Sequence, residues 1–90
     1  MTRVEQFTKV QNEGLATFKQ KNADYDDSFA HHGVLGTLIR IHDKLNRFTS
    51  VSNKQIALVD DEKLRDTLMD LANYAHIAVF LLDEGKEDDV

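Results

Sequence analysis

The chain has 90 residues, which is enough for one small domain with a modest hydrophobic core. Its 41% hydrophobic and 30% charged residues are typical of a globular protein, and its net charge of −5 argues against duplex nucleic acid as a partner. With no cysteine, the sequence excludes disulfides, thiolate nucleophiles and cysteine-ligated zinc. No apolar run approaches the ~20 residues needed to cross a bilayer, and the first residues do not resemble a signal peptide. We therefore expect a cytoplasmic protein with no membrane partner.

A first helix is predicted from about Thr2 to Lys21, because apolar residues recur there at every third or fourth position. Thr2 and Glu5 have the spacing of a capping box. Gly14 lies inside this helix at a cost of up to ~1 kcal/mol relative to alanine, which a close contact with another helix would explain. The polar segment 22–29 is predicted to be a connection, because Asn, Asp and Ser side chains compete for backbone hydrogen bonds.

A second helix is predicted from about Val34 to Phe48, followed by a connector over 49–59. Five apolar residues at alternating spacings of four and three form its expected core stripe: Val34, Leu38, Ile41, Leu45 and Phe48.

A third helix is predicted from about Asp60 to Glu84, because an acidic residue suits the start of a helix and Gly85 suits its end. We expect one domain over 1–85, followed by a frayed acidic tail over 86–90.

The second half of the third helix is apolar nearly all round, with Ile77, Phe80 and Leu81 projecting away from its core seam. Three helices cannot cover every face of such a helix. We predict an all-α fold, a three-helix unit that assembles by homo-oligomerisation, as a dimer or higher, into a four-helix-type or larger bundle. The alternative is that the first helix covers this surface.

An acidic ladder on the third helix is the most informative pattern. Glu62, Asp66, Asp70 and Asn73 are spaced by four, four and three, which places them on one stripe. Four apolar residues form the opposite stripe: Leu64, Leu68, Leu71 and Ala75. Carboxylates on one face suit Mg²⁺ or Mn²⁺, and the alternative is a solvated acidic face.

A basic stripe lies on the second helix, where Arg40, Lys44 and Arg47 follow each other at four and three with Asp43 alongside. Arginine and lysine suit phosphate groups. The alternative is an outer face on which Asp43 forms ion pairs along the helix.

A third candidate cluster follows the first helix. It contains Lys21, Asn22, Asp24 and Tyr25, and an aromatic ring beside a cation and an amide suits base stacking and phosphate contact. Tyr25 is equally suited to packing over the end of a bundle. The sequence has no glycine-rich phosphate loop and no Ser/His/Asp order typical of nucleophilic catalysis.

Taken in order, the segments KNADYDDSF (21–29), GTLIRIHDKLNRF (36–48) and DE…DTLMDLANYA (61–75) resemble the nucleotide modification associated domain 1 family. These are small helical proteins found largely in phages and bacteria. The resemblance covers nearly the whole chain. It implies a role connected with nucleotides, in the cytoplasm of a bacterial host if the protein is phage-encoded.

A broader similarity is to the all-α nucleoside triphosphate pyrophosphatases of the MazG type, which hold Mg²⁺ with four carboxylates from two helices. The segment from Glu62 to Asp70 resembles the later of their two acidic elements, although its acids are spaced by four. The earlier element is not found, because the second helix carries mainly cations where paired carboxylates would be needed.

These observations favour a nucleotide-binding protein of phage type that requires no cofactor. Arg40, Lys44 and Arg47 would hold the phosphates, Lys21 and Tyr25 would add charge and stacking, and Asp66, Asp70 and Asn73 would contact ribose or base or orient the arginines. The expected ligand site comprises Lys21, Asp24, Tyr25, Arg40, Asp43, Lys44, Arg47, Asp66, Asp70 and Asn73. It would act in nucleotide metabolism or modification, or sequester a nucleotide signal of host immunity.

Two alternatives stay open at this point. One is Mg²⁺-dependent pyrophosphohydrolysis of a (deoxy)nucleoside triphosphate, with Glu62, Asp66 and Asp70 as metal ligands. The other is a bundle that binds a protein partner through Ile77, Phe80 and Leu81.

Overall fold

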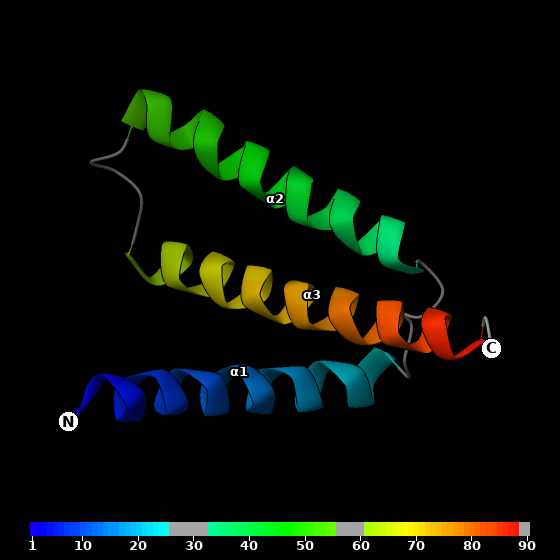
Figure 1. Ribbon diagram of the computed structural model, residues 1–90. Coiled ribbons are helices and arrows are strands. Elements are labelled where there is room, and N and C mark those ends of the chain that lie inside the picture. The colour runs from blue at the N-terminus through cyan, green and yellow to red at the C-terminus, as the bar shows by residue number, and fades with distance from the viewer. Residues whose placement is uncertain (26–32, 56–60, 89–90) are drawn as a thin grey trace.

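The computed structural model describes the backbone of residues 1–25, 33–55 and 61–88, and side chains within 1–23, 33–47 and 62–85. Its three helices are α1 (Arg3–Tyr25), α2 (Gly33–Gln55) and α3 (Asp61–Asp88), shown in Figure 1. Over the described ranges there is no strand, so the expected all-α class is confirmed. None of the described helices has a stretch both long and apolar enough to span a membrane.

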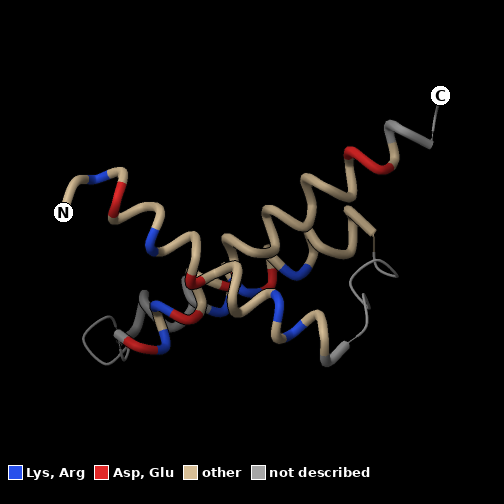
Figure 2. The backbone as a smooth tube through the Cα atoms, turned by 90° about the horizontal axis from the view of Figure 1, so that it is seen from below, with Lys and Arg blue, Asp and Glu red and all other residues tan. Residues whose placement is uncertain are grey.

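The central helix is α3. It runs antiparallel to α2 on one side and has α1 on its other side (Figure 1). The packing of α2 on α3 is more extensive than that of α1 on α3. Figure 2 shows that α1 crosses α3 at an angle and that the two helices diverge toward the chain ends, which limits the contact between them.

The start of α1 confirms the predicted capping box. The backbone N–H of Glu5 donates to Thr2 Oγ1 at 3.1 Å, and the N–H of Thr2 donates to Glu5 Oε1 at 3.4 Å. These two bonds satisfy donors that have no partner within the helix.

All three helices extend further than the sequence patterns predicted. The helix α1 continues to Tyr25 and α2 to Gln55, although polar segments were expected to end them at Lys21 and Phe48. Residues 26–29 of the first expected connection and 56–59 of the second lie outside the described part of the chain. Polar residues disfavour a helix only weakly, by up to ~0.7 kcal/mol each, so they do not by themselves end one.

The expected stop at Gly85 is also wrong, because α3 runs through this residue to Asp88. A single glycine costs only ~1 kcal/mol in a helix, which a 28-residue element tolerates. Of the expected tail, 86–88 is therefore helical, and 89–90 lies outside the described residues. At the start of α2, Gly33 has φ +66°, a left-handed conformation in which any side chain would be strained.

Gly14 lies at the point where α1 crosses α3, which agrees with the predicted close contact with another helix. A Cβ atom at this position would lie 3.1 Å from Asn73 Oδ1 and 3.1 Å from Met69 Sδ. The Asn73 amide also donates a hydrogen bond to the Gly14 carbonyl at 3.1 Å. The absent side chain therefore lets the backbone of α1 approach α3 closely enough for this bond to form.

Two further contacts hold the crossing on either side of Gly14. The Arg65 guanidinium donates from Nη1 and Nη2 to the two Glu13 carboxylate oxygens, at 2.6 and 2.9 Å. This hydrogen-bonded pairing lowers the pKa of Glu13. Phe18 of α1 meets Phe80 of α3 edge to face, with ring centroids 6.5 Å apart.

The predicted core stripe of α3 packs only in part, because Leu64 and Leu71 are half-buried but Leu68 and Ala75 are exposed. Leu68, expected in the core, is 56% exposed, whereas Ile77 is only 6% exposed. Asp70 and Asn73, expected on the outer stripe, are half-buried between the helices. Both faces of α3 carry apolar residues, so periodicity alone does not tell which face packs within the chain.

The residues expected to form the self-contact are used inside the chain. Ile77 is buried, Phe80 packs on Phe18, and Leu81 is half-buried. On α2 the packed face is likewise rotated from the predicted core stripe, since Thr37 is 3% exposed and Leu38 is 49% exposed. Within the predicted stripe, Val34 and Ile41 are half-buried and Leu38 and Leu45 are exposed. The side chain of Phe48 lies outside the described set.

The resulting core is thin for a chain of this size. The accessible surface of 7338 Å² exceeds by about 2,000 Å² the value expected for a compact monomer of this mass. The radius of gyration is 15.2 Å, against ~12 Å for a compact 90-residue domain. Among the described side chains, none is more than 98% buried.

Enlarging Gly14 tests the helix crossing. Gly14→Leu should lower the free energy of unfolding by ~1–3 kcal/mol, because the side chain would displace Met69 and break the Asn73 bond. Urea unfolding followed by circular dichroism measures this. Ala16→Leu, at an exposed position two residues along α1, is the matched control and should change stability by less than ~0.5 kcal/mol. Equal effects of the two substitutions would contradict the crossing.

Candidate functional site

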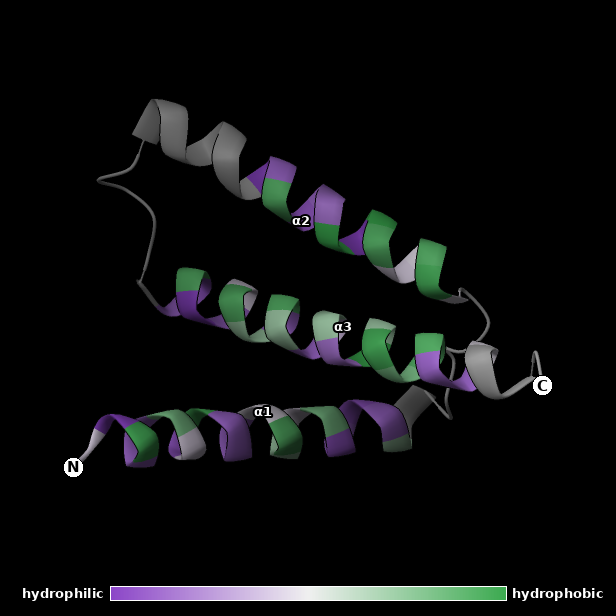
Figure 3. Ribbon diagram, viewed as in Figure 1, coloured by the Kyte–Doolittle hydropathy of each residue, from purple (hydrophilic) through white to green (hydrophobic). Residues whose placement is uncertain are grey.

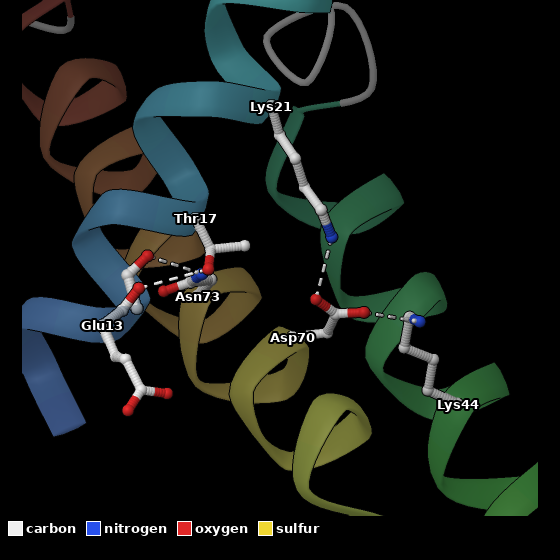
Figure 4. Close-up of polar contacts among 7 residues, drawn as sticks. Glu13, Thr17, Lys21, Lys44, Asp70 and Asn73 are labelled. Atoms are coloured by element: carbon white, nitrogen blue, oxygen red, sulfur yellow. Dashed lines mark hydrogen bonds and ion pairs between the residues drawn. The ribbon is translucent and has the colours of Figure 1, made fainter. Parts of the chain in front are cut away.

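The candidate site is centred on Asp70, where side chains from all three helices meet. Lys21 Nζ of α1 donates to Asp70 Oδ1 at 3.0 Å, and Lys44 Nζ of α2 donates to Asp70 Oδ2 at 3.2 Å. Figure 4 shows each ammonium group meeting a different oxygen of the Asp70 carboxylate. The two lysines lie 49 and 26 positions from Asp70 in the sequence, so only the fold brings this cluster together.

The cluster has a positive balance of two cations to one anion. Burial raises the pKa of Asp70, but the hydrogen bonds from Lys21 and Lys44 outweigh it, so the pKa lies below its ordinary value. Asp70 is therefore a carboxylate at neutral pH. The side chain of Lys44 is 33% exposed and that of Lys21 is 56% exposed, so both remain accessible to an anion from solvent.

Tyr74 completes the cluster one helical turn after Asp70. Lys44 Nζ lies 5.8 Å from the centre of the Tyr74 ring, within the range of a cation–π interaction. Tyr74 was absent from the predicted site. The four-residue spacing from Asp70 was the available signal, because it puts both side chains on the same face of α3.

Asn73 has a packing role that differs from its predicted one. Its amide is bonded to the Gly14 carbonyl, and Figure 4 shows it beside Glu13 and Thr17 of α1, away from Lys44. The structure therefore separates Asn73 from the lysine cluster, although the two residues are close in sequence.

The acidic ladder does not gather into a cage. Glu62 and Asp66 are exposed, and Asp70 is engaged by two lysines. Considering only the described part of the chain, no three His, Asp or Glu side chains gather closely enough to hold a metal ion. Carboxylates four residues apart on one helix are ~6 Å apart along its axis, so a cage would need acids from a second helix.

The predicted basic stripe is divided by the fold. Lys44 points into the cluster, whereas Arg40 and Arg47 are exposed. Their spacings of four and three from Lys44 place both on the same edge of α2 as Lys44. Asp43 is exposed next to them. Figure 2 shows how the charged positions of the three helices are distributed along the backbone.

Lys21, Asp24 and Tyr25 all belong to α1 rather than to a connection. Lys21 is in the cluster, whereas the side chains of the other two lie outside the described set. Next to Lys21, the side-chain oxygen of Asn22 is buried and accepts no hydrogen bond from the residues that the structure describes. An unmet acceptor of this kind costs ~1–3 kcal/mol, so a donor to Asn22 would stabilise this end of α1.

The model of the family described as nucleotide modification associated domain 1 matches residues 21–82, more than half of the chain. The chain belongs to this family. The family segment contains every member of the Asp70 cluster, from Lys21 to Tyr74, and it excludes Gly14. Comparison with curated proteins and with solved structures finds no match.

Acid titration tests the state of Asp70. Its pKa is lowered in the folded chain, so the unfolded chain takes up the proton at a higher pH. The contribution of Asp70 to stability should be complete above the ordinary pKa near ~4 and should be lost as the pH falls through the folded value. At neutral pH, Asp70→Asn should lower the free energy of unfolding by ~1 kcal/mol.

Urea unfolding from about pH 7 to about pH 2 measures the gap in the free energy of unfolding between wild type and Asp70→Asn. The gap should close toward the acid end. Asp66→Asn, one turn earlier at an exposed position, is the control. A gap that stays constant at every pH would show that Asp70 is not the carboxylate that the lysines stabilise.

Proposed function

We propose that this protein binds a nucleotide, or a signal derived from one, and that Lys21 and Lys44 hold its phosphate groups. One observation carries the proposal: two ammonium groups from separate helices converge on one carboxylate within a family associated with nucleotide modification. The protein would act in nucleotide metabolism or modification, or it would sequester a nucleotide signal of host immunity.

Asp70 acts in this proposal as a stand-in for phosphate. Its two oxygens lie 3.0 and 3.2 Å from the two ammonium groups, a geometry that two phosphate oxygens can also adopt. The carboxylate holds both ammonium groups at one point. An arriving phosphate, with more negative charge and more acceptor oxygens, competes for the same donors.

The surrounding charges extend this binding edge. Arg40 and Arg47 are exposed on the same edge of α2 as Lys44 and would hold further phosphate oxygens. Tyr74 would offer its ring to a base. Tyr25 and Asp24, near Lys21 in α1, would supply further stacking and polar contact, and the exposed carboxylates of Asp43 and Asp66 would accept from ribose hydroxyls.

Direct contact between lysine and phosphate needs no metal ion. The alternative, Mg²⁺-dependent hydrolysis of MazG type through Glu62, Asp66 and Asp70, would require Asp70 to exchange its lysine partners for the metal. The pairing of Asp70 with two cations supports the binding role over this alternative. We also propose that the protein works as a homo-oligomer, which the thin core supports.

Removing the two ammonium groups tests the site. Lys21→Gln with Lys44→Gln should weaken nucleotide binding at least ~10-fold, since two charge-assisted hydrogen bonds are lost. Isothermal titration calorimetry with nucleoside mono-, di- and triphosphates at low salt measures this. The matched control is Lys9→Gln with Lys19→Gln, two exposed lysines of α1. Equal affinities of the two double variants, or no binding to any nucleotide, would contradict the proposal.

Asp70→Asn separates binding from hydrolysis. If phosphate takes the place of the carboxylate, this variant should bind a few-fold more tightly, because the amide competes less for the lysines. If Asp70 holds Mg²⁺, the variant should instead lose Mg²⁺-dependent phosphate release. Measuring affinity and turnover on the same preparation distinguishes the two, and a fall in affinity with the fold intact would oppose the stand-in role.

A further inference from the structure

The exposed face of α3 carries an apolar stripe that nothing in the chain covers within the described residues. Leu68 and Val79 are each 56% exposed and Leu82 is 49% exposed, and the two alanines between them are also exposed. The stripe consists of Leu68, Ala72, Ala75, Val79 and Leu82, at spacings of four, three, four and three. Figure 3 shows hydrophobic positions recurring along this helix.

Helical geometry places this stripe opposite the Asp70 cluster. At 100° per residue, Leu68 and Ala75 lie roughly half a turn of the helix away from Asp70 and Ile77. The face toward α1 and α2 is already packed, because Ile77 is 6% exposed. The stripe is therefore a second, separate apolar face, and it has the spacing of a coiled-coil seam.

The surface area of the chain indicates a large missing contact. The excess of about 2,000 Å² over a compact monomer is well above the ~800 Å² that each partner contributes to a standard interface. An occupant of an apolar helical seam with heptad spacing must itself present an apolar helix.

The pattern of the stripe points to a second copy of this chain. From Leu68 to Val79 it is large, small, small, large, at spacings of four, three and four, so it is the same in either direction. About a two-fold axis between residues 73 and 74, Leu68 of one copy faces Val79 of the second copy, and Ala72 faces Ala75. The two alanines allow the helices to approach closely at the axis.

The charges beside the stripe agree with this arrangement. Arg65 and Asp83 are exposed, and helical geometry puts both on the same side of the stripe, near its opposite ends. In an antiparallel pair, Arg65 of each copy, which already pairs with Glu13 of its own chain, lies at the level of Asp83 of the second copy. In a parallel pair, Arg65 of one copy and Asp83 of the second would lie ~27 Å apart along the helix axis and would not meet.

We infer that two copies of this chain pair through α3, antiparallel, with the stripe from Leu68 to Leu82 as the interface. The pairing leaves the Asp70 cluster on the far side of α3, so a dimer has two outward-facing clusters. The inference does not depend on nucleotide binding, and its test does not use a nucleotide.

Single cysteines test the direction of pairing, since the chain has none of its own. A mixture of Leu68→Cys and Val79→Cys should form a covalent dimer on mild oxidation, because these positions face each other across the axis. Neither variant alone should do so, since its two cysteines would be ~16 Å apart along the axis, and a disulfide needs Cβ atoms ~4 Å apart. Cross-linking of either single variant alone, or none in the mixture, would overturn the antiparallel pairing.

Light scattering and native mass spectrometry test the interface itself. Wild type should be a dimer or a multiple of one, and Leu68→Asp should raise the dissociation constant at least ~100-fold while circular dichroism reports the helical content. Ile39→Asp, at a 52% exposed position of α2, is the matched control and should stay dimeric. A monomeric wild type, or dissociation by Ile39→Asp but not by Leu68→Asp, would overturn the inference. If Leu68→Asp also loses its helices, the cysteine mixture decides.

Discussion

The pairing of Asp70 with two lysines is the contact that ties the three helices of this small fold together. It joins α1, α2 and α3 at one point, in a chain whose described buried apolar residues are Ile77 and Ala78. A partly buried carboxylate is costly unless its charge is matched, and here two ammonium groups from other helices match it. The same three side chains form an accessible cluster of two cations and one anion. Stability and the proposed binding function therefore rest on the same residues.

The crossing of α1 over α3 is the second constraint, because it gives Lys21 access to Asp70. Gly14 sets the distance between the two helices, and the Asn73 amide fixes it by bonding the Gly14 carbonyl. The Glu13–Arg65 pair and the Phe18–Phe80 contact hold the crossing from its two sides. Exposed ion pairs contribute little to stability, so the close approach at Gly14 and the aromatic contact are the more important terms.

Much of the local structure could be predicted from the sequence, because local rules govern it. The three helices follow from apolar periodicity, the start of α1 from the Thr2 and Glu5 spacing, and the close crossing from Gly14. Helix ends were predicted less well, because the preferences of polar residues and of Gly85 against a helix are too weak to end one.

The relative placement of the helices could not be predicted in the same way. Periodicity identified both stripes of α3, but the choice of the packed one depends on long-range contacts with α1 and α2. Lys44 and Asp70 were both candidates, yet nothing local indicates that they pair with each other. Tyr74 was missed for the same reason, since its role follows from the position of Lys44. Asn73 was assigned to a ligand from its place on the acidic ladder. Its actual partner, the Gly14 carbonyl, lies 59 positions away and nothing local indicates it.

The thin core gives ligand binding an additional effect. In a marginally stable chain, any molecule that binds only the folded state shifts the folding equilibrium by mass action. At a ligand concentration 100 times the dissociation constant, the gain is ~2.7 kcal/mol, a large share of the stability expected for a domain of this size. Because the Asp70 cluster exists only when all three helices are assembled, an anion held there would stabilise the whole fold. The lifetime of such a protein against proteolysis would then follow the concentration of its ligand in the cell.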